Sequence, residues 1–215
     1  MSEHSPLVSV VMATYNRAKL LPRAIVSLGA QSYTNWELII LDDGSTDETA
    51  DVVAALMAQD PRIRYQWQKN GGLTTARNAG MKLATGAMLT FLDSDDEYAP
   101  AHLKLRVDYL AAHPDIELLH GGVAIVGGSD HVPDRHNPEV LIALADCVIG
   151  GTFFMRQQVY GKMGGFRKPD YGNDADFMER AGKFCCIAKV DFPTYIYHRE
   201  TPDSMCNLME KGSHA

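Results

Sequence analysis

Short apolar runs alternate with amphipathic stretches over the first half of the chain. The runs are rich in β-branched residues and are too short for helices, which is typical of buried parallel strands. They are Leu7 to Met12, Leu38 to Leu41, Ile63 to Trp67 and Met88 to Leu92. Between them, apolar residues recur at helical spacing over residues 21–28, in a segment capped by Thr46 or Asp47, and over Thr74 to Ala84. The alternation predicts an α/β fold, with a mostly parallel central sheet and helices on both faces.

The second half of the chain has a less regular pattern. Helices are expected from Pro100 to about Ala112, over a short stretch ending near Gly161, and from Asp174 to Phe184. Strand character is found in Ile116 to Val126, Gly150 to Met155, near Val190 and in Tyr195 to Tyr197. Gly127 to Pro138 and Gly164 to Gly172 are expected to be loops. No linker divides the 215 residues, so a single domain is expected.

Composition and charge exclude several classes of protein. Hydrophobic residues make up 46% and charged residues 22%, the balance of a globular protein rather than a disordered one. The formal net charge of -7 argues against a nucleic-acid partner, because duplex binders need a stripe of Lys and Arg to displace counterions. A nucleotide ligand is not excluded, since a divalent ion can supply the positive charge.

The lack of a recognisable targeting signal in the sequence leads us to expect a cytoplasmic location. No segment reaches the roughly 20 consecutive apolar residues of a membrane span, and the first residues lack a basic-then-apolar signal pattern. Peripheral contact with a membrane stays open. The cysteines have no spacing typical of zinc sites or disulfide frameworks, so reduced, mostly buried thiols are expected; they are Cys147, Cys185, Cys186 and Cys206.

Polar and acidic residues follow three of the predicted strands. Thr14-Tyr15-Asn16 follows the first strand, Asp42-Asp43 the second, and Asp93-Ser94-Asp95-Asp96 the fourth. Because the carboxyl ends of parallel strands meet at one edge, where α/β proteins bind ligands, these residues are expected to share a site. Three carboxylates in four residues would repel one another unless a cation sits among them, and carboxylates one residue apart suit Mn²⁺ or Mg²⁺.

The residue types alone leave alternatives open at each position. Asp43 fits a turn as well as a hydrogen bond to the edge of a uracil, thymine or guanine base. Asp174 can serve as a general base or simply satisfy backbone donors at the start of a helix. Asp93-Ser94-Asp95 can be a solvated turn, and His198 taken alone is most simply an ordinary histidine.

Several motifs occur in an order and spacing that resemble those of family 2 glycosyltransferases. They extend over residues 6 to about 204. The motifs are Thr14-Tyr15-Asn16-Arg17, Leu41-Asp42-Asp43-Gly44-Ser45-Thr46-Asp47, Asn70-Gly71-Gly72, Ala76-Arg77-Asn78-Ala79-Gly80, Phe91-Leu92-Asp93-Ser94-Asp95-Asp96, Gly164-Gly165-Phe166, Asn173-Asp174-Ala175-Asp176-Phe177 and Tyr197-His198-Arg199. The resemblance implies an inverting enzyme of GT-A fold that uses a nucleotide diphosphate sugar, with residues 1–98 binding the donor and 99–215 the acceptor.

The resemblance also implies a role for individual residues. On the donor side, Asp43 would bond the edge of the base, Arg77 would support the nucleotide, and Asp93 would contact the ribose or the water shell of the metal. Asp95 would ligate Mn²⁺ or Mg²⁺, and His198 would complete the metal shell. The remaining donor-binding positions implied by the motifs are Thr14, Tyr15, Asn16 and Gly72.

Asp174 matches the acidic residue that acts as the general base in the family. The usual Glu-Asp pair is here Asn173-Asp174, which removes one negative charge beside the base and should ease its ionisation. The implied reaction moves one sugar, with a UDP-sugar as the expected donor, to a carbohydrate or lipid-linked acceptor in surface glycan or polysaccharide assembly. No Gln-x-x-Arg-Trp pattern of a processive synthase is present.

Other classes account for fewer of the motifs. A nucleotidyltransferase or a Rossmann dehydrogenase would need a Gly-rich loop after the first strand, which Met12-Ala13-Thr14-Tyr15-Asn16 does not supply. A phospho-receiver domain would leave the second acidic cluster unexplained. A non-catalytic module that binds nucleotide sugars has the same motifs, and only an assay of sugar transfer or donor hydrolysis separates it from an enzyme.

Overall fold

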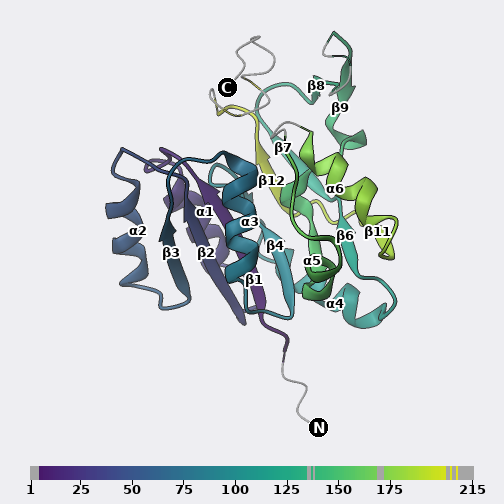
Figure 1. Ribbon diagram of the computed structural model, residues 1–215, viewed down its shortest axis with the longest axis horizontal. Helices are drawn as coiled ribbons and strands as arrows, with labels where there is room; N and C mark the ends of the chain where they lie inside the picture. The colour runs from purple at the N-terminus through teal and green to yellow at the C-terminus, as the bar shows by residue number, and fades with distance from the viewer. Residues whose placement is uncertain are drawn as a thin grey trace.

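The computed structural model describes residues 5–134, 137, 139–168, 172–201, 204 and 207. Its main element is a seven-stranded sheet with the order β11-β6-β10-β4-β1-β2-β3 (Figure 1). Within it, β10 runs antiparallel to both its neighbours, and the other pairings are parallel. The strands are β1 (Val8–Thr14), β2 (Trp36–Asp42), β3 (Ile63–Trp67), β4 (Met88–Phe91), β6 (Leu118–His120), β10 (Phe154–Arg156) and β11 (Ile187–Lys189). The expected mostly parallel sheet is confirmed.

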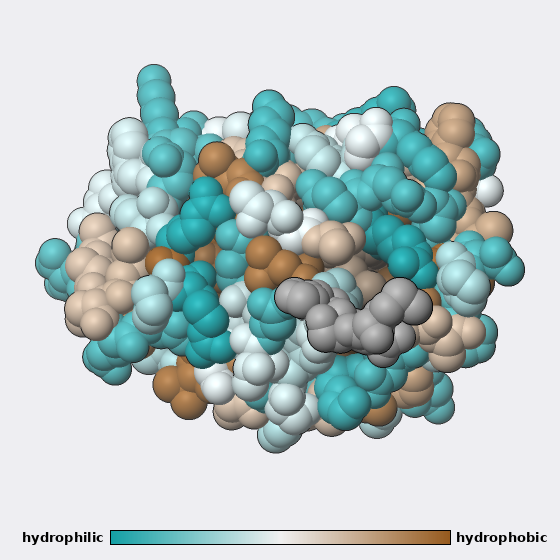
Figure 2. Space-filling model, turned by 90° about the horizontal axis from the view of Figure 1, so that it is seen from below, coloured by the Kyte–Doolittle hydropathy of each residue, from teal (hydrophilic) through white to brown (hydrophobic). Residues whose placement is uncertain are grey.

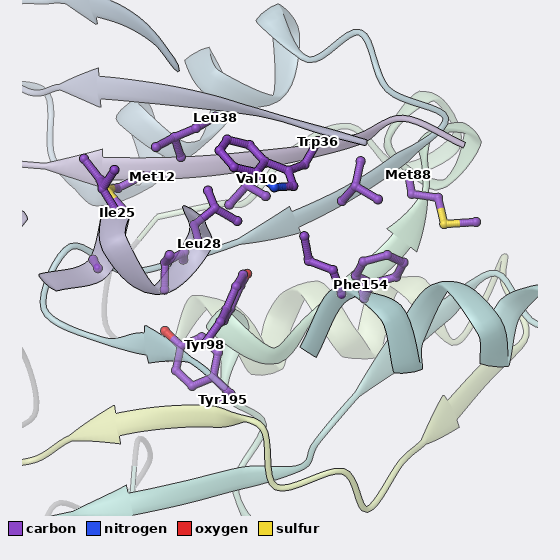
Figure 3. Close-up of a cluster of buried hydrophobic side chains, with 14 of the residues drawn as sticks. Val10, Met12, Ile25, Leu28, Trp36, Leu38, Met88, Tyr98, Phe154 and Tyr195 are labelled. Carbon is purple, nitrogen blue, oxygen red and sulfur yellow. The ribbon is translucent and has the colours of Figure 1, made fainter. Parts of the chain in front are cut away.

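Helices cover both faces of this sheet, because successive side chains of a strand point to opposite sides. Val10 and Met12 belong to a core cluster that includes side chains of α1 (Leu21–Gly29), α2 (Thr49–Met57) and α4 (His102–Ala112). Val11 belongs to a cluster on the other face, with side chains of α3 (Leu73–Leu83), α5 (Gln157–Met163) and α6 (Asn173–Ala181). Figure 3 shows Ile25 and Leu28 of α1 together with Val10 and Met12 of β1, all members of the first cluster.

The stretch Ile116 to Val126, expected as one strand, is divided into β6 and β7 (Val123–Val126). Gly121 and Gly122 between them adopt φ angles of 91° and 75°, and a Cβ on Gly122 would clash with the backbone of Phe192. Because of this break, β6 and β7 belong to different sheets. β7 joins a three-stranded sheet of order β5-β12-β7, formed with β5 (Glu97–Tyr98) and β12 (Tyr195–His198).

Other elements of the second half also differ from the sequence-based boundaries. Gly127 to Pro138, expected as a loop, contains β8 (His131–Pro133), which pairs with β9 (Leu141–Ala143); Pro138 itself lies outside the described residues. The stretch from Gly150 starts as a 3-10 turn, η2 (Gly150–Thr152), before β10. A second 3-10 turn, η1 (Leu144–Asp146), links β9 to this region. The expected strand near Val190 is β11, which ends one residue earlier, and α6 ends at Ala181 rather than Phe184.

Strands from both halves of the sequence build the main sheet, with β1 to β4 from the first half and β6, β10 and β11 from the second. The face shown in Figure 2 is mostly hydrophilic, and its hydrophobic groups are small and separate. None of the helices in the described part of the chain has the length and apolarity needed to cross a bilayer. Cys147 and Cys185 are half-buried and Cys186 is exposed, so the expectation of mostly buried thiols is wrong for these three, and Cys206 lies outside the described residues.

Candidate active site

The carboxyl ends of β1, β2 and β4 meet at one edge of the main sheet. Thr14 at the end of β1 pairs in register with Asp42 at the end of β2, and Val11 pairs with Phe91 at the end of β4. The expectation that the acidic strand ends share an edge is therefore confirmed. Asp42 itself is fully buried and accepts hydrogen bonds from the Ser45 amide at 2.8 Å and the Tyr65 hydroxyl at 2.5 Å, so it supports the turn after β2 rather than facing a ligand.

Asp43 organises the loop that precedes α3. Its Oδ1 accepts hydrogen bonds from Gln68 Nε2 at 2.7 Å and the Gly71 amide at 2.9 Å, and its Oδ2 accepts one from the Gly72 amide at 2.8 Å. Gly72, the N-cap of α3, has a φ of 89°, which glycine adopts without strain. Each carboxylate oxygen can accept two hydrogen bonds, so Oδ2 keeps capacity for a further donor. Its predicted bond to a base stays a prediction.

The last residue of β1 and the two residues after it lie beside Asp43, whose amide donates a hydrogen bond to the Thr14 carbonyl at 2.8 Å. The Thr14 side chain is buried, and its hydroxyl has no hydrogen-bond partner among the described residues. Tyr15 is 48% exposed, so its ring is available to stack on a flat ligand. Asn16 has a φ of 51° and holds the next loop, with its amide donating to Ser45 Oγ at 2.8 Å and its side-chain oxygen accepting from the Thr46 amide at 2.8 Å.

Arg77 contacts both Asp93 and Asp174, for which the family resemblance implies roles in donor binding and in proton transfer from the acceptor. From α3, one guanidinium nitrogen donates to Asp93 Oδ1 at 2.7 Å and another to Asp174 Oδ1 at 3.1 Å. The guanidinium is 4% exposed, while Asp93 and Asp174 are 29% and 26% exposed. A buried cation between two partly exposed anions is a preorganised electrostatic centre, because the two ion pairs hold it in place without a ligand.

The environment of Asp174 tunes its basicity. Burial raises the pKa of its carboxyl above the ordinary 3.8, and the charge of Arg77 together with the Gly150 amide, which donates to Oδ2 at 2.9 Å, partly offsets that rise. Gly150 has no side chain at this contact, and a Cβ there would clash with Oδ1 of Asp174. The carboxylate is therefore held from two sides and is more basic than a solvent-exposed one, as a general base requires.

Asp96 anchors the acidic motif to the end of the chain. Its Oδ2 accepts a hydrogen bond from the Tyr195 hydroxyl at 2.7 Å and its Oδ1 accepts one from the His198 amide at 2.9 Å. The residue is 1% exposed, and burial together with the charges of Asp95 and Asp93 raises the pKa of its carboxyl well above 3.8. This pairing places β12 beside the acidic strand end.

His198 lies between two glutamates. Its Nε2 is 2.7 Å from Glu97 Oε1 and its Nδ1 is 2.6 Å from Glu200 Oε1. Arg23 lies beside this group and donates to the backbone carbonyl of Asp95 at 2.5 Å. Both ring nitrogens are engaged, so ligation of a metal by His198 would require one of these contacts to open.

The described residues hold no group of three or more His, Cys, Asp or Glu side chains that forms a preassembled metal site. Mg²⁺ and Mn²⁺ do not need one, because they are commonly held by one or two carboxylates together with waters and substrate phosphates. The carboxylates of Asp93 and Asp95 after β4 fit that mode of binding. Metal ligation by Asp95 and His198 stays a prediction.

A cavity of about 340 Å³ opens beside Arg77, Asp93 and Asp174. Its other walls come from β8, β9, η1 and the start of α6. In Figure 1, β8 and β9 lie above α6, on the side of the molecule where β12 also ends. The cavity is on the order of the smaller ligand pockets of proteins, about 300 Å³ and upward.

Comparison with known proteins identifies the family. The profile of glycosyl transferase family 2 matches residues 9–167, so the chain belongs to this family of enzymes. A glycosyltransferase of Nostoc sp., itself uncharacterised, is 38% identical over 129 residues, covering 60% of this chain and 40% of that protein. The putative colanic acid biosynthesis glycosyl transferase WcaA of Escherichia coli is 42% identical over 106 residues, covering 48% of this chain and 37% of that protein. The matches thus span less than half of either relative.

Solved structures with the same fold confirm the GT-A architecture. TarS 1-349 of S. aureus in complex with UDP-GlcNAc superposes with a TM-score of 0.75 at 22% identity, covering 90% of this chain and 58% of that one. The mannosyltransferase PcManGT from Pyrobaculum calidifontis, in complex with GDP-Man and Mn²⁺, gives a TM-score of 0.73 at 18% identity, covering 95% of this chain and 59% of that one.

Sequence reasoning missed several residues that shape this site. Gln68, Gly150 and Tyr195 each contact one of the key aspartates, and none belongs to a motif that signals chemistry. Gly150-Gly151 before an apolar run carried a usable signal, because paired glycines often mark a close backbone approach. Glu97 was readable as a continuation of the acidic cluster, but its partner His198 is 101 residues away.

Proposed function

We propose that the chain transfers one sugar from a nucleotide diphosphate sugar to an acceptor hydroxyl, with inversion at the anomeric carbon. The observation that carries this proposal is the link from Asp93 through Arg77 to Asp174 in the lining of a cavity. It places a basic carboxylate and a buried cation next to the strand ends where α/β proteins bind nucleotides.

On the donor side, Tyr15 would stack on the base and Asp43 would accept a hydrogen bond from its edge, with Thr14, Asn16 and Gly72 shaping the same part of the site. Arg77 would support the nucleotide through Asp93. A UDP-sugar is the expected donor, and the UDP-GlcNAc complex of TarS, which has the same fold, is consistent with it.

A divalent ion, Mn²⁺ or Mg²⁺, would be held by Asp95, with His198 as a further ligand, and would supply positive charge to the departing diphosphate. The Mn²⁺ in the mannosyltransferase complex supports this assignment by analogy of fold.

On the acceptor side, Asp174 would accept the proton of the acceptor hydroxyl. The acceptor oxygen forms its bond to the anomeric carbon while the bond from that carbon to the diphosphate breaks on the opposite side, which inverts the configuration. Both oxygens of Asp174 already accept one hydrogen bond, and each has a second lone pair for the acceptor. The names of WcaA and of the putative teichuronic acid transferase TuaG of Bacillus subtilis suggest surface polysaccharide assembly as the setting.

Replacement of the base tests the proposal. Asp174→Asn keeps the shape of the side chain but not its charge, and we expect turnover to fall roughly a hundred- to ten-thousandfold, the usual contribution of a general base, with donor binding nearly unchanged by calorimetry. Asp108→Asn, at an exposed position of α4, is the matched control and should behave as wild type. Unchanged turnover in Asp174→Asn would remove the base assignment, and donor binding without transfer by wild type would favour a non-catalytic binding module.

A further inference from the structure

The helix that carries Asp174, α6, begins after a glycine cap. The cap residue is Gly172, which has a φ of 74° and no side chain to accept a hydrogen bond from the first turn. The first amides of a helix have no intrahelical partners, so a turn without a side-chain cap is held less firmly by its own helix. The position of Asp174, the second residue of α6, therefore depends on contacts with other elements.

Two adjacent residues of α6 are bonded to α3. Asn173 Nδ2 donates to Thr74 Oγ1 at 2.9 Å, and Asp174 Oδ1 accepts from Arg77 at 3.1 Å. Thr74 and Arg77 are three residues apart on α3 and therefore lie on one face of that helix. The contact between Asn173 and Thr74 thus sets the position of the turn from which the Asp174 carboxylate reaches Arg77.

The bond between Asn173 and Thr74 is sheltered from water. Asn173 is 3% exposed and Thr74 is 4% exposed. A buried amide and a buried hydroxyl cannot exchange their bond for one to water, which makes their separation unfavourable. The amide is also neutral, so it makes this contact without placing a second negative charge beside Asp174.

The rest of α6 is held by a separate set of contacts. Phe177, three residues after Asp174, is fully buried, and its ring stacks on those of Phe166 and Phe153 with centroid distances of 4.6 and 5.5 Å. Loss of the Asn173 bond would therefore loosen the first turn of α6 while the helix stays packed on the core.

We infer that Asn173 is a positioning residue for the reaction: by holding the first turn of α6 on Thr74, it keeps the Asp174 carboxylate beside Arg77 and in place for the acceptor hydroxyl. This inference rests on the proposed function for the role of Asp174. Asn173 acts through Asp174 and takes no part in proton transfer itself.

Crystal structures of variants test the placement without relying on turnover. In Asn173→Ala, we expect the contact between Arg77 and Asp174 to open beyond about 4 Å while the contact between Arg77 and Asp93 remains. Thr74→Val keeps the shape of the side chain but removes the hydroxyl, so it should have the same effect, whereas Thr74→Ser should retain the contact. An intact contact between Arg77 and Asp174 in either Asn173→Ala or Thr74→Val would overturn the inference.

Turnover separates positioning from a merely structural role. Per folded molecule, measured by circular dichroism, Asn173→Ala and Thr74→Val should lower kcat about tenfold to a hundredfold with little change in KM for the donor, and Thr74→Ser should restore it. Added to Asp174→Asn, Asn173→Ala should lower the residual turnover less than about twofold, because the base on which it acts is gone. A further loss of about tenfold in that double variant would overturn the inference.

Asn35→Ala is the matched control. It removes an exposed side-chain bond to the Ser5 carbonyl, so kcat should match that of wild type. The inference and the proposed function fail separately. If wild type transfers no sugar, the proposed function is rejected, and the crystal structures still decide what places Asp174. If wild type transfers sugar and Asn173→Ala keeps its kcat, the inference fails and the proposed function stands.

Discussion

The hydroxyl of Tyr195 donates a hydrogen bond to Oδ2 of Asp96 over 2.7 Å, across 99 residues of sequence. Both groups are buried, Tyr195 at 0% and Asp96 at 1% exposure. Tyr195 begins β12 and Asp96 closes the acidic motif after β4, so this bond, together with the one from the His198 amide, joins β12 to the acidic motif. The ring of Tyr195 also lies 5.8 Å from that of Tyr98 in an edge-to-face arrangement, and both rings are shown in Figure 3.

Tyr195→Phe should therefore destabilise the protein. The variant keeps the ring but leaves the buried Asp96 carboxyl short of one donor, which costs about 1–3 kcal/mol. Urea unfolding followed by circular dichroism measures this as a lower midpoint. Tyr15→Phe, which removes a hydroxyl from a side chain that is 48% exposed, should leave the midpoint unchanged. Equal midpoints for Tyr195→Phe and wild type would show that the bond contributes nothing.

Gly150→Ala should impair catalysis more than folding. The added methyl group would clash with Asp174 Oδ1, so the carboxylate must move from its place between Arg77 and the Gly150 amide. A misplaced base can cost about a hundredfold in kcat, with a smaller change in KM for the donor. Gly161→Ala in α5 is the matched control, because a methyl group added at that position would meet no atom within 4 Å. Full activity of Gly150→Ala would separate Gly150 from the positioning of Asp174.

The pH dependence of transfer should reflect the raised pKa of Asp174. Below that pKa the carboxyl is protonated and cannot accept the acceptor proton, so kcat/KM should fall with decreasing pH, and the midpoint of the fall should lie above 3.8. Donor binding measured by calorimetry over the same pH range should change less. A midpoint at or below 3.8 would contradict the environment described for Asp174.

Asp95→Ala should remove the metal dependence of donor binding. Because the proposed ion touches the protein mainly through this carboxylate, we expect the Mn²⁺-dependent gain in affinity for a nucleoside diphosphate to fall about tenfold or more. Affinity in the presence of EDTA should match that of wild type. Asp108→Ala serves as the control, and a full Mn²⁺ effect in Asp95→Ala would place the ion elsewhere.

Sequence predicts the donor half of this molecule well because its information is local. Each strand there is a short apolar run, and the residues just after it must lie at the same edge once the strands are parallel. The acceptor half depends on contacts that no local pattern encodes. The contact of Tyr195 with Asp96 depends on the packing of β12, and the contact of Gly150 with Asp174 depends on the packing of β10.

The roles of individual aspartates show the same limit. Asp42 and Asp43 are adjacent and chemically identical, yet Asp42 is enclosed by Tyr65 and Ser45, whereas Asp43 holds the start of α3. Successive side chains of an extended chain point to opposite sides, so the sequence separates these two side chains. Which of the two faces a ligand depends on the residues that pack against each side. The sequence therefore predicts where the carboxylates gather better than it predicts what each one does.

The reversed direction of β10 determines which segment of the chain brings Gly150 to the site. The parallel strands end at the edge of the sheet where the site lies, whereas β10 begins there. The turn before β10 therefore brings Gly150 to the site. Under the proposed function, the nucleotide contacts come mainly from residues before β5, whereas Gly150 and Asp174 come from either side of β10. A change in the segment just before β10 would therefore alter the amide donor that holds Asp174 while leaving β1, β2 and β4 in place.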